Sequence, residues 1–524
     1  YNMGEFQKYG IGQQDFRNLI EEDCIYVDET RYIETILNSG SKYYFLARPR
    51  RFGKSLFLST LQYFFEGRRE LFKGLYIDSV EALWETHPVL RLDLNKERYA
   101  TPGKLEDVLD KIFRNWEETY GVERLDNNLP QRFEAIIEKA HSSSGKRVVI
   151  LVDEYDKPLV GNINDEKTFE HYRMALASLY SNFKSNAEHI RLVFLTGVSR
   201  FSRLSVFSEL NNLSDITFDN RFADVCGITD KEVLENLKPG IARLAKTLDV
   251  SFDCALMKLK KNYDGYRFTE NGSDIYNPWS LLNALDQSKI SNFWNETGLP
   301  TIVAESLKRV DANLEETFNC YCSEDELKGL DLLNPNPLPL LYQTGYITIK
   351  NYNRELESFH LGIPNREVKY GLLNLLLPYY ITVKTGTVNQ LMTAMKLAFI
   401  SGKPEKAMKL IRTYFAGVDY AMQMDNENNF HNAFFLLIDI IGLNAKTESH
   451  TSSGRIDIEI VTEKFIYIIE LKYDKPASSA LDQILKKGYA LKYQLDKRTI
   501  FLVGASFSSA TRTLNDWLIE SFPH

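Results

Sequence analysis

Short apolar runs recur along the first part of the chain, and amphipathic segments separate them. Continuous apolar runs are typical of strands in a sheet covered on both faces, and apolar residues three and four positions apart are typical of helices. Strands that alternate with helices indicate βαβ units and a mostly parallel sheet. The expected strands are 43–47, 89–94, 148–152 and 191–196, and the clearest expected helices are 32–37, 105–120 and 131–140.

The pattern changes twice further along the chain. From about residue 230 to residue 400, helical segments alternate with short strand-like pieces and Pro- or Asn-rich breaks. From about residue 405, two helical stretches precede a second group of strands. The expected helices of this last part are 405–415, 430–441 and 477–493, and its expected strands are 456–461, 465–471 and 499–503.

Composition indicates an ordinary globular protein of several domains. The chain has 524 residues, of which 44% are hydrophobic and 26% are charged, and this length predicts two to four domains. No apolar run approaches the roughly 20 residues that a membrane-spanning helix needs, and we expect no signal peptide. The five cysteines are expected to be reduced thiols. We therefore expect a cytoplasmic protein without membrane contact.

A phosphate-binding loop follows the first expected strand. The sequence RPRRFGKS leads from an apolar run into an expected helix at 56–65. Backbone N–H groups at such a helix N-terminus hold phosphate, while Lys54 reaches the outer phosphates and the Ser55 hydroxyl binds Mg²⁺. Arg48 stands where the full pattern has Gly, which predicts a differently shaped loop or weaker nucleotide binding. The candidate nucleotide contacts are Arg48, Pro49, Arg50, Arg51, Phe52, Gly53, Lys54, Ser55 and Leu56.

The strand at 148–152 supplies acidic residues for the same site. It ends in Asp153 and Glu154. An Asp at the tip of a strand beside the phosphate loop can hold Mg²⁺ through water, and a Glu directly after it can act as general base toward the attacking water. Together with the loop, these two carboxylates predict a site for ATP and Mg²⁺.

The strand at 191–196 contributes a third element. It runs into a polar turn, in which Thr196 or Ser199 can sense the γ-phosphate. Arg200 can neutralise the charge that develops in the transition state. An ordinary solvated arginine is an equally good explanation of Arg200.

The loop resembles that of the predicted AAA-ATPase-like family of bacterial proteins, in which Arg often replaces the expected Gly. The likeness extends over roughly the first 285 residues, and it implies that the family tolerates Arg48. Motifs that match are YVD at 26–28, LVDEYDKP at 151–158, TGVSRFS at 196–202, NNLSD at 211–215, YDGYRF at 263–268 and YNPWS at 276–280.

A second group of chemically active residues lies near the end of the chain. The segments 454–460 and 465–472 predict a hairpin. Side chains two positions apart share a strand face, so Glu470 and Lys472 point the same way and Asp457 meets them across the hairpin. Two carboxylates can hold Mg²⁺, and a lysine beside them can orient or deprotonate a metal-bound water, as phosphodiester cleavage requires.

Other residues complete this candidate nuclease site. Glu427 and Glu448 are further acidic candidates, and Gln483 on the next expected helix can bind the scissile phosphate or the water. The arrangement resembles the PD-(D/E)XK nuclease superfamily over about the last 110 residues. The alternative is a solvated hairpin edge. Residues that match the superfamily are Asp457, Glu470, Lys472, Gln483, Ile484 and Tyr489.

Charge limits how nucleic acid can bind. The net charge is −8 and the pI is near 5.7, so the basic surface that DNA needs is either one local groove or belongs to another domain. Lys486, Lys487 and Lys492 follow the candidate site and are the first candidates, with a solvated helix face as the alternative. We expect a nucleic-acid partner, with DNA favoured over RNA, and leave assembly into a homo-oligomer open.

The sequence therefore predicts an α/β protein of three parts. Residues 1–285 form an AAA-ATPase-like region whose P-loop core, at about 40–230, is a parallel sheet with helices on both faces. Residues 286–404 form a mostly helical linking region with a winged-helix-like element, and residues 405–524 form a restriction-endonuclease-like α/β domain. We expect ATP to drive or regulate a Mg²⁺-dependent nuclease. The alternatives are a regulatory NTPase switch whose last domain binds a partner without cleaving, and a nucleotide-binding scaffold without hydrolysis.

Overall fold

Two compact units make up the chain. The computed structural model describes residues 7–123, 128–163, 165–200, 213–294, 303–304, 306–307, 313–329, 336–380, 385–416, 427–451, 454–511 and 513–522. The first unit consists of Tyr1–Leu299 and Asn319–Lys369, and the second consists of Pro300–Phe318 and Tyr370–His524. Residues 286–404, which the sequence predicts as a linking region, therefore contribute to both units.

A five-stranded parallel sheet forms the centre of the first unit, in the order β2-β3-β4-β1-β5. The predicted parallel sheet is confirmed. Because β4 lies between β1 and β3, the segments that leave these three strands meet at one edge of the sheet, where ligands bind in such folds. The strands are β1 (Tyr43–Ala47), β2 (Val89–Asp93), β3 (Val148–Asp153), β4 (Ile190–Gly197) and β5 (Ser214–Asp215).

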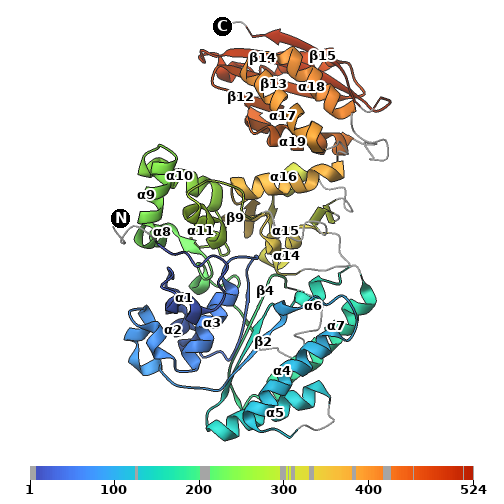
Figure 1. Cartoon of the computed structure of the whole chain (residues 1–524). Coiled ribbons are helices and arrows are strands. Elements are labelled where there is room, and N and C mark those ends of the chain that lie inside the picture. Colours follow the sequence, from blue (N-terminus) through green and yellow to red (C-terminus); the bar gives the residue numbers. More distant parts are fainter. Residues whose placement is uncertain are drawn as a thin grey trace. The chain divides into compact units, whose positions relative to one another are not determined.

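Helices cover both faces of this sheet, as predicted (Figure 1). The helix α3 follows the phosphate loop and packs against β2, β3 and β4, while α4, α5 and α7 pack together on the other side. The helices are α1 (Phe16–Glu21), α2 (Arg31–Asn38), α3 (Lys54–Phe65), α4 (Lys104–Tyr120), α5 (Leu129–Ser144), α6 (Lys157–Val160) and α7 (Glu166–Ser185). Short 3-10 turns are η1 (Arg69–Phe72), η2 (Tyr76–Ser79), η3 (Glu81–Leu83), η4 (Leu94–Lys96) and η6 (Asn220–Phe222).

The rest of the first unit is mostly helical, as predicted, and includes two small antiparallel sheets. The first group comprises β6 (Ile228–Thr229), α8 (Asp230–Asn236), α9 (Lys238–Thr247), α10 (Phe252–Tyr263), β7 (Ile275–Tyr276) and α11 (Pro278–Asp286). The second group comprises β8 (Tyr321–Cys322), α14 (Glu324–Lys328), α15 (Leu338–Thr344), β9 (Thr348–Asn353) and β10 (Ser358–Gly362).

The second unit contains a mixed sheet in the order β11-β12-β13-β14-β15, in which only β13 and β14 pair in parallel. The predicted hairpin is β12-β13, and α20 makes the crossover that a parallel pair requires. The strands are β11 (Asn444–Thr451), β12 (Gly454–Val461), β13 (Phe465–Tyr473), β14 (Thr499–Ser508) and β15 (Thr513–Ser521). The helices are α13 (Leu314–Thr317), α16 (Arg366–Tyr380, which crosses the boundary between the units), α17 (Thr385–Ile400), α18 (Pro404–Ala416), α19 (Glu427–Ile441), α20 (Ala477–Lys487) and η7 (Leu491–Tyr493).

One predicted helix is too long. The sequence predicts a helix over residues 477–493, but α20 ends at Lys487 and a separate 3-10 turn follows. Gly488 ends the helix, because it takes the left-handed conformation at φ 62° and its N–H bonds back to the helix. Glycine adopts this conformation without strain. As for membrane contact, none of the helices in the described residues has both the length and the apolar character needed to cross a bilayer.

Candidate nucleotide and nuclease sites

The phosphate loop connects β1 to α3 in the way that a P-loop requires. Gly53 precedes the helix with φ 96°, a left-handed conformation that favours glycine. Lys54 begins α3 and is buried, and its Nζ donates to the carbonyl oxygens of Arg48 at 2.9 Å and Pro49 at 3.1 Å. The lysine thus lies along the inner side of its own loop, close to where phosphate binds in such loops.

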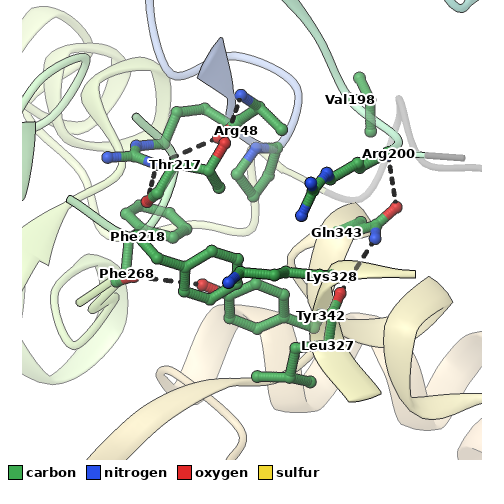
Figure 2. Close-up of a pocket in the computed structure, with 12 residues that line it drawn as sticks. Arg48, Val198, Arg200, Thr217, Phe218, Phe268, Leu327, Lys328, Tyr342 and Gln343 are labelled. Atoms are coloured by element: carbon green, nitrogen blue, oxygen red, sulfur yellow. Dashed lines mark hydrogen bonds between the residues drawn. The ribbon is translucent and has the colours of Figure 1, made fainter. Parts of the chain in front are cut away.

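Arg48 has a structural role in the loop. Its backbone is outside the left-handed region, so this position does not need glycine. Its buried guanidinium donates to the carbonyl oxygens of Ala47 at 3.1 Å, Thr217 at 3.0 Å and Phe222 at 2.9 Å, and it lies 4.3 Å from the centre of the Phe268 ring (Figure 2). Burial lowers the pKa of Arg48. The side chain ties the loop to the segment after β5.

Substitution Arg48→Met is expected to destabilise the first unit. The carbonyl oxygens of Ala47, Thr217, Phe222 and Val225 lose the Arg48 donor, although that of Phe222 still accepts from the Val225 N–H at 3.3 Å. Each carbonyl oxygen left without a donor costs about 1–3 kcal/mol, while removal of a buried charge offsets part of the loss. We expect the free energy of unfolding to fall by about 2–4 kcal/mol. Urea unfolding followed by tryptophan fluorescence measures the change. Arg114→Met, at a side chain that is 52% exposed, is the control, and equal stability of both variants contradicts this role.

Other side chains of the loop also pack against later parts of the first unit. Arg51, at φ 67°, stacks 3.9 Å from the centre of the Trp279 ring and donates to the carbonyl of Phe293 at 3.0 Å. Phe52 is buried and its ring centre is 4.8 Å from that of Tyr266. The aromatic motifs of the middle region thus support the outer side of the phosphate loop.

Acidic residues lie at the end of β3, near the loop. Asp153 is buried and accepts a hydrogen bond from Thr196 Oγ1 at 2.9 Å. Glu154 has φ 49°, an unusual conformation for a residue other than glycine. Such strain persists where the surrounding structure enforces it and is concentrated at functional sites. The fold thus places the Glu154 carboxylate with Lys54 and Ser55 along one pocket.

Asp156 connects the β3 segment to the end of β4. Its carboxylate accepts from the backbone N–H groups of Val198 at 3.1 Å and Ser199 at 2.6 Å. Burial raises the pKa of Asp156 to about 6, and the nearby Glu154 carboxylate adds to this effect. The turns that follow the two strands are therefore held together.

A cavity of about 720 Å³ extends from the phosphate loop, which is within the usual range for a small-molecule pocket. Away from the loop, much of its lining is apolar, as a nucleobase needs, although Gln13, Gln14 and Glu29 also line it. Sequence reasoning missed this part, because the residues come from segments far apart in the chain and carry no motif spacing. Its lining there includes Tyr9, Ile11, Ile25, Val27, Ile228, Trp279 and Leu282.

The structure does not bring Arg200 into this pocket. Its Nε is 3.0 Å from Asp215 Oδ2, and it lies with Arg48 and Lys328 around a separate cavity of about 20 Å³ (Figure 2). Its backbone N–H donates to Gln343 Oε1 at 2.9 Å. Ser199 is buried outside the pocket lining, and of the three predicted sensors only Thr196 contacts a candidate metal ligand.

The candidate nuclease residues come together on β12, β13 and α20. Asp457 Oδ2 accepts a hydrogen bond from the backbone N–H of Leu471 at 2.8 Å. Lys472 Nζ lies 3.1 Å from Glu470 Oε1. Gln483 Nε2 donates to the same oxygen of Glu470 and is 3.4 Å from the Tyr489 hydroxyl. The fold therefore positions the carboxylates, the lysine and the glutamine as one group.

Glu470 has the environment of a metal ligand. It is 1% exposed, and its Oε2 accepts no hydrogen bond from the residues that the structure describes. Burial raises the pKa of Glu470 to about 7, and the charge of Asp457 adds to this effect while Lys472 opposes it. A buried carboxylate oxygen without a donor needs compensation, and a hard divalent cation supplies it. These residues thus fit a magnesium ion.

Other predicted contacts are differently placed. Lys492 pairs with the buried Glu459, which also accepts from the Tyr493 hydroxyl, so this lysine anchors η7 to β12. Lys486 and Lys487 are exposed. The side chains of Glu427, at the start of α19, and Glu448, in β11, lie outside the described residues. Among the described residues, no group of three or more His, Cys, Asp or Glu side chains is arranged to hold a metal.

Comparison with known proteins finds a family model for each of the two regions. A family model described as "Predicted AAA-ATPase" matches residues 10–207, and one for the PD-(D/E)XK nuclease superfamily matches residues 425–517. A protein of Azotobacter chroococcum mcd 1, known as "Uncharacterized protein in vnfD 5'region", is 32% identical over 525 residues, covering 98% of this chain and 99% of that protein. The chain belongs to the AAA-ATPase-like family. Its last domain belongs to the PD-(D/E)XK nuclease superfamily.

The match of the AAA-ATPase-like model includes the whole parallel sheet except β5. It ends before the group from β6 to α11, which supplies the Trp279 side of the pocket. The similarity to the Azotobacter protein extends over nearly the full length. The alignment with the Azotobacter protein therefore spans both regions.

Proposed function

We propose that the first unit binds and hydrolyses ATP. The observation that carries this proposal is the single pocket that holds Lys54, Ser55 and Glu154, with Asp153 directly beside it. Lys54 binds the outer phosphates, Ser55 and Asp153 hold Mg²⁺ with oxygen ligands, and Glu154 takes a proton from the attacking water. The apolar end beyond the loop accepts the base. When bound, Mg²⁺ neutralises charge on the phosphates.

We propose that the last domain is a Mg²⁺-dependent nuclease acting on DNA. Asp457 and Glu470 would hold the metal, which supplies an activated water when bound. Lys472 orients that water and adds positive charge toward the scissile phosphate, and Gln483 holds Glu470 in place. The support is the convergence of these four side chains together with the orphaned Oε2 of Glu470.

We further propose that ATP regulates the nuclease, and Lys54→Met tests this link. Single- and double-stranded DNA and RNA are incubated with Mg²⁺, with and without ATP, and cleavage is followed on gels. The wild type is expected to cleave DNA at a rate that ATP changes. Lys54→Met is expected to cleave at one rate with or without ATP, because it lacks the cation for the outer phosphates.

Two outcomes contradict the proposal in different ways. If the wild type binds but cleaves no polynucleotide under any of these conditions, the last domain is a binding module. If Lys54→Met keeps the full response to ATP, the nucleotide does not act through this loop. Lys73→Met, at an exposed residue far from the loop in sequence, controls for general effects of removing a lysine.

A further inference from the structure

Lys157 lies at the phosphate end of the nucleotide pocket. It begins α6, three residues after Glu154, and lines the same cavity as Lys54 and Ser55. Its Nζ is 3.7 Å from Glu154 Oε2 and donates to Asn95 Oδ1 at 2.8 Å. The side chain remains 32% exposed. The ammonium group is therefore held at the pocket wall, beside the proposed general base.

The contacts of Lys157 contribute little to the stability of the fold. An ion pair of this exposure contributes about 0–1 kcal/mol, and Asn95 is a neutral partner. Both partners line the same pocket, so all three groups are available to one ligand. A lysine ammonium is a compact charge with three donors on a flexible stem, which suits a position that must meet an incoming anion.

Hydrolysis of ATP needs a cation at this place. The water oxygen forms a bond to the terminal phosphorus, the bond from that phosphorus to the bridging oxygen of ADP breaks, and the water proton moves to the Glu154 carboxylate. Negative charge is spread over the transferred phosphoryl group and the leaving oxygen. Preorganised positive groups in a pocket stabilise that charge.

Arg50 lines the pocket from the phosphate loop, and Arg91 lies 3.6 Å from Asp153 Oδ2. The other cations near the site are placed differently. Arg200, the sensor expected from the sequence, pairs with Asp215 beside the separate small cavity. Arg51 stacks on Trp279 and donates to a backbone carbonyl. Lys54 approaches from the loop side. Lys157 is the lysine that lies beside Glu154, and hence beside the water that this residue would activate.

We propose that Lys157 contacts the terminal phosphate of bound ATP and neutralises the charge that develops during hydrolysis. This inference rests on the proposed ATP hydrolysis. It means that one chain supplies the transition-state cation by itself, without an arginine from a second copy. Turnover per chain is then independent of protein concentration.

Lys157→Met keeps an unbranched side chain only one atom shorter and removes its charge, so it tests this role. We expect kcat to fall about 100-fold, as on loss of one preorganised donor, while the Kd for ADP changes little because ADP lacks the terminal phosphate. Affinity for ADP with aluminium fluoride, which mimics the transferred phosphoryl group, is expected to fall with kcat. Lys157→Arg should restore part of kcat and part of the affinity for ADP with aluminium fluoride. Lys167→Met, at an exposed lysine of α7, should change neither quantity.

Each outcome has a distinct meaning. If the wild type does not hydrolyse ATP, the proposed function itself is wrong. If the wild type hydrolyses ATP and Lys157→Met does so equally fast, only the role of Lys157 is overturned. It is also overturned if Lys157→Met loses ADP affinity and turnover to the same extent, because the side chain then serves binding or structure. Turnover per chain that rises with protein concentration shows that a second copy supplies the cation.

Discussion

Glu154→Gln is expected to lower ATP turnover by about 100- to 10,000-fold, the range for loss of a general base. The amide has the shape of the carboxylate but cannot accept the proton of the attacking water. Nucleotide binding should persist, because Lys54 and the loop backbone are unchanged. Phosphate release under steady-state conditions measures turnover, and titration with a fluorescent ATP analogue measures affinity.

The matched control for this variant is Glu138→Gln, at an exposed position of α5, which should turn over ATP like the wild type. The unusual backbone of Glu154 sharpens the test, since both Glu and Gln must adopt φ 49° there. Glu and Gln bear the same backbone strain, so the substitution should change the stability of the protein little. A loss of turnover then reports the loss of the proton acceptor. Unchanged turnover in Glu154→Gln would show that another group activates the water.

Much of the fold could be predicted because its signals are local. The strands β1 and β3 are continuous apolar runs, and the loop that follows β1 has fixed spacing. The hairpin β12-β13 was visible because alternation places Glu470 and Lys472 on one face. The end of α20 was not, because Gly488 within an otherwise helical pattern gives only a weak signal.

Arg48 and Arg200 show that sequence alone does not predict which partners a side chain contacts in the folded protein. Arg48 looked like a defect in a glycine position, but its backbone is outside the left-handed region and its guanidinium is satisfied by carbonyls from residues 217–225. Arg200 looked like a sensor because it follows a strand of the sheet. The placement of Arg200 depends on its ion pair with Asp215 and on the hydrogen bond from its backbone N–H to Gln343, and Gln343 is distant in sequence.

The apolar part of the pocket could not be predicted from the sequence either. Its walls combine the segment before α1 with β6 and α11, and no local pattern marks residues that meet only in the folded chain. Lys157, by contrast, stood within a recognised motif. Its role could not be inferred there, because a lysine that follows acidic residues is ordinarily a solvated ion-pair partner. Only its contacts with Asn95 and Glu154 place it at the pocket wall.

Lys472→Ala is expected to reduce DNA cleavage by at least about 100-fold while leaving ATP binding and turnover unchanged. The lysine Nζ lies 3.1 Å from Oε1 of the same Glu470 carboxylate whose Oε2 is orphaned. Its loss removes both the orientation of the water and the positive charge against the developing phosphorane. Gel assays of cleavage in Mg²⁺, beside phosphate release by the same preparation, measure the two activities.

Lys475→Ala is the matched control, because this exposed lysine lies three residues later, beyond the end of β13. It should cleave like the wild type. Cleavage by Lys472→Ala at the wild-type rate would show that the group on β12 and β13 is a structural ion pair. Loss of both cleavage and DNA binding would mean that Lys472 holds the substrate, since a residue that acts on the water alone leaves binding intact.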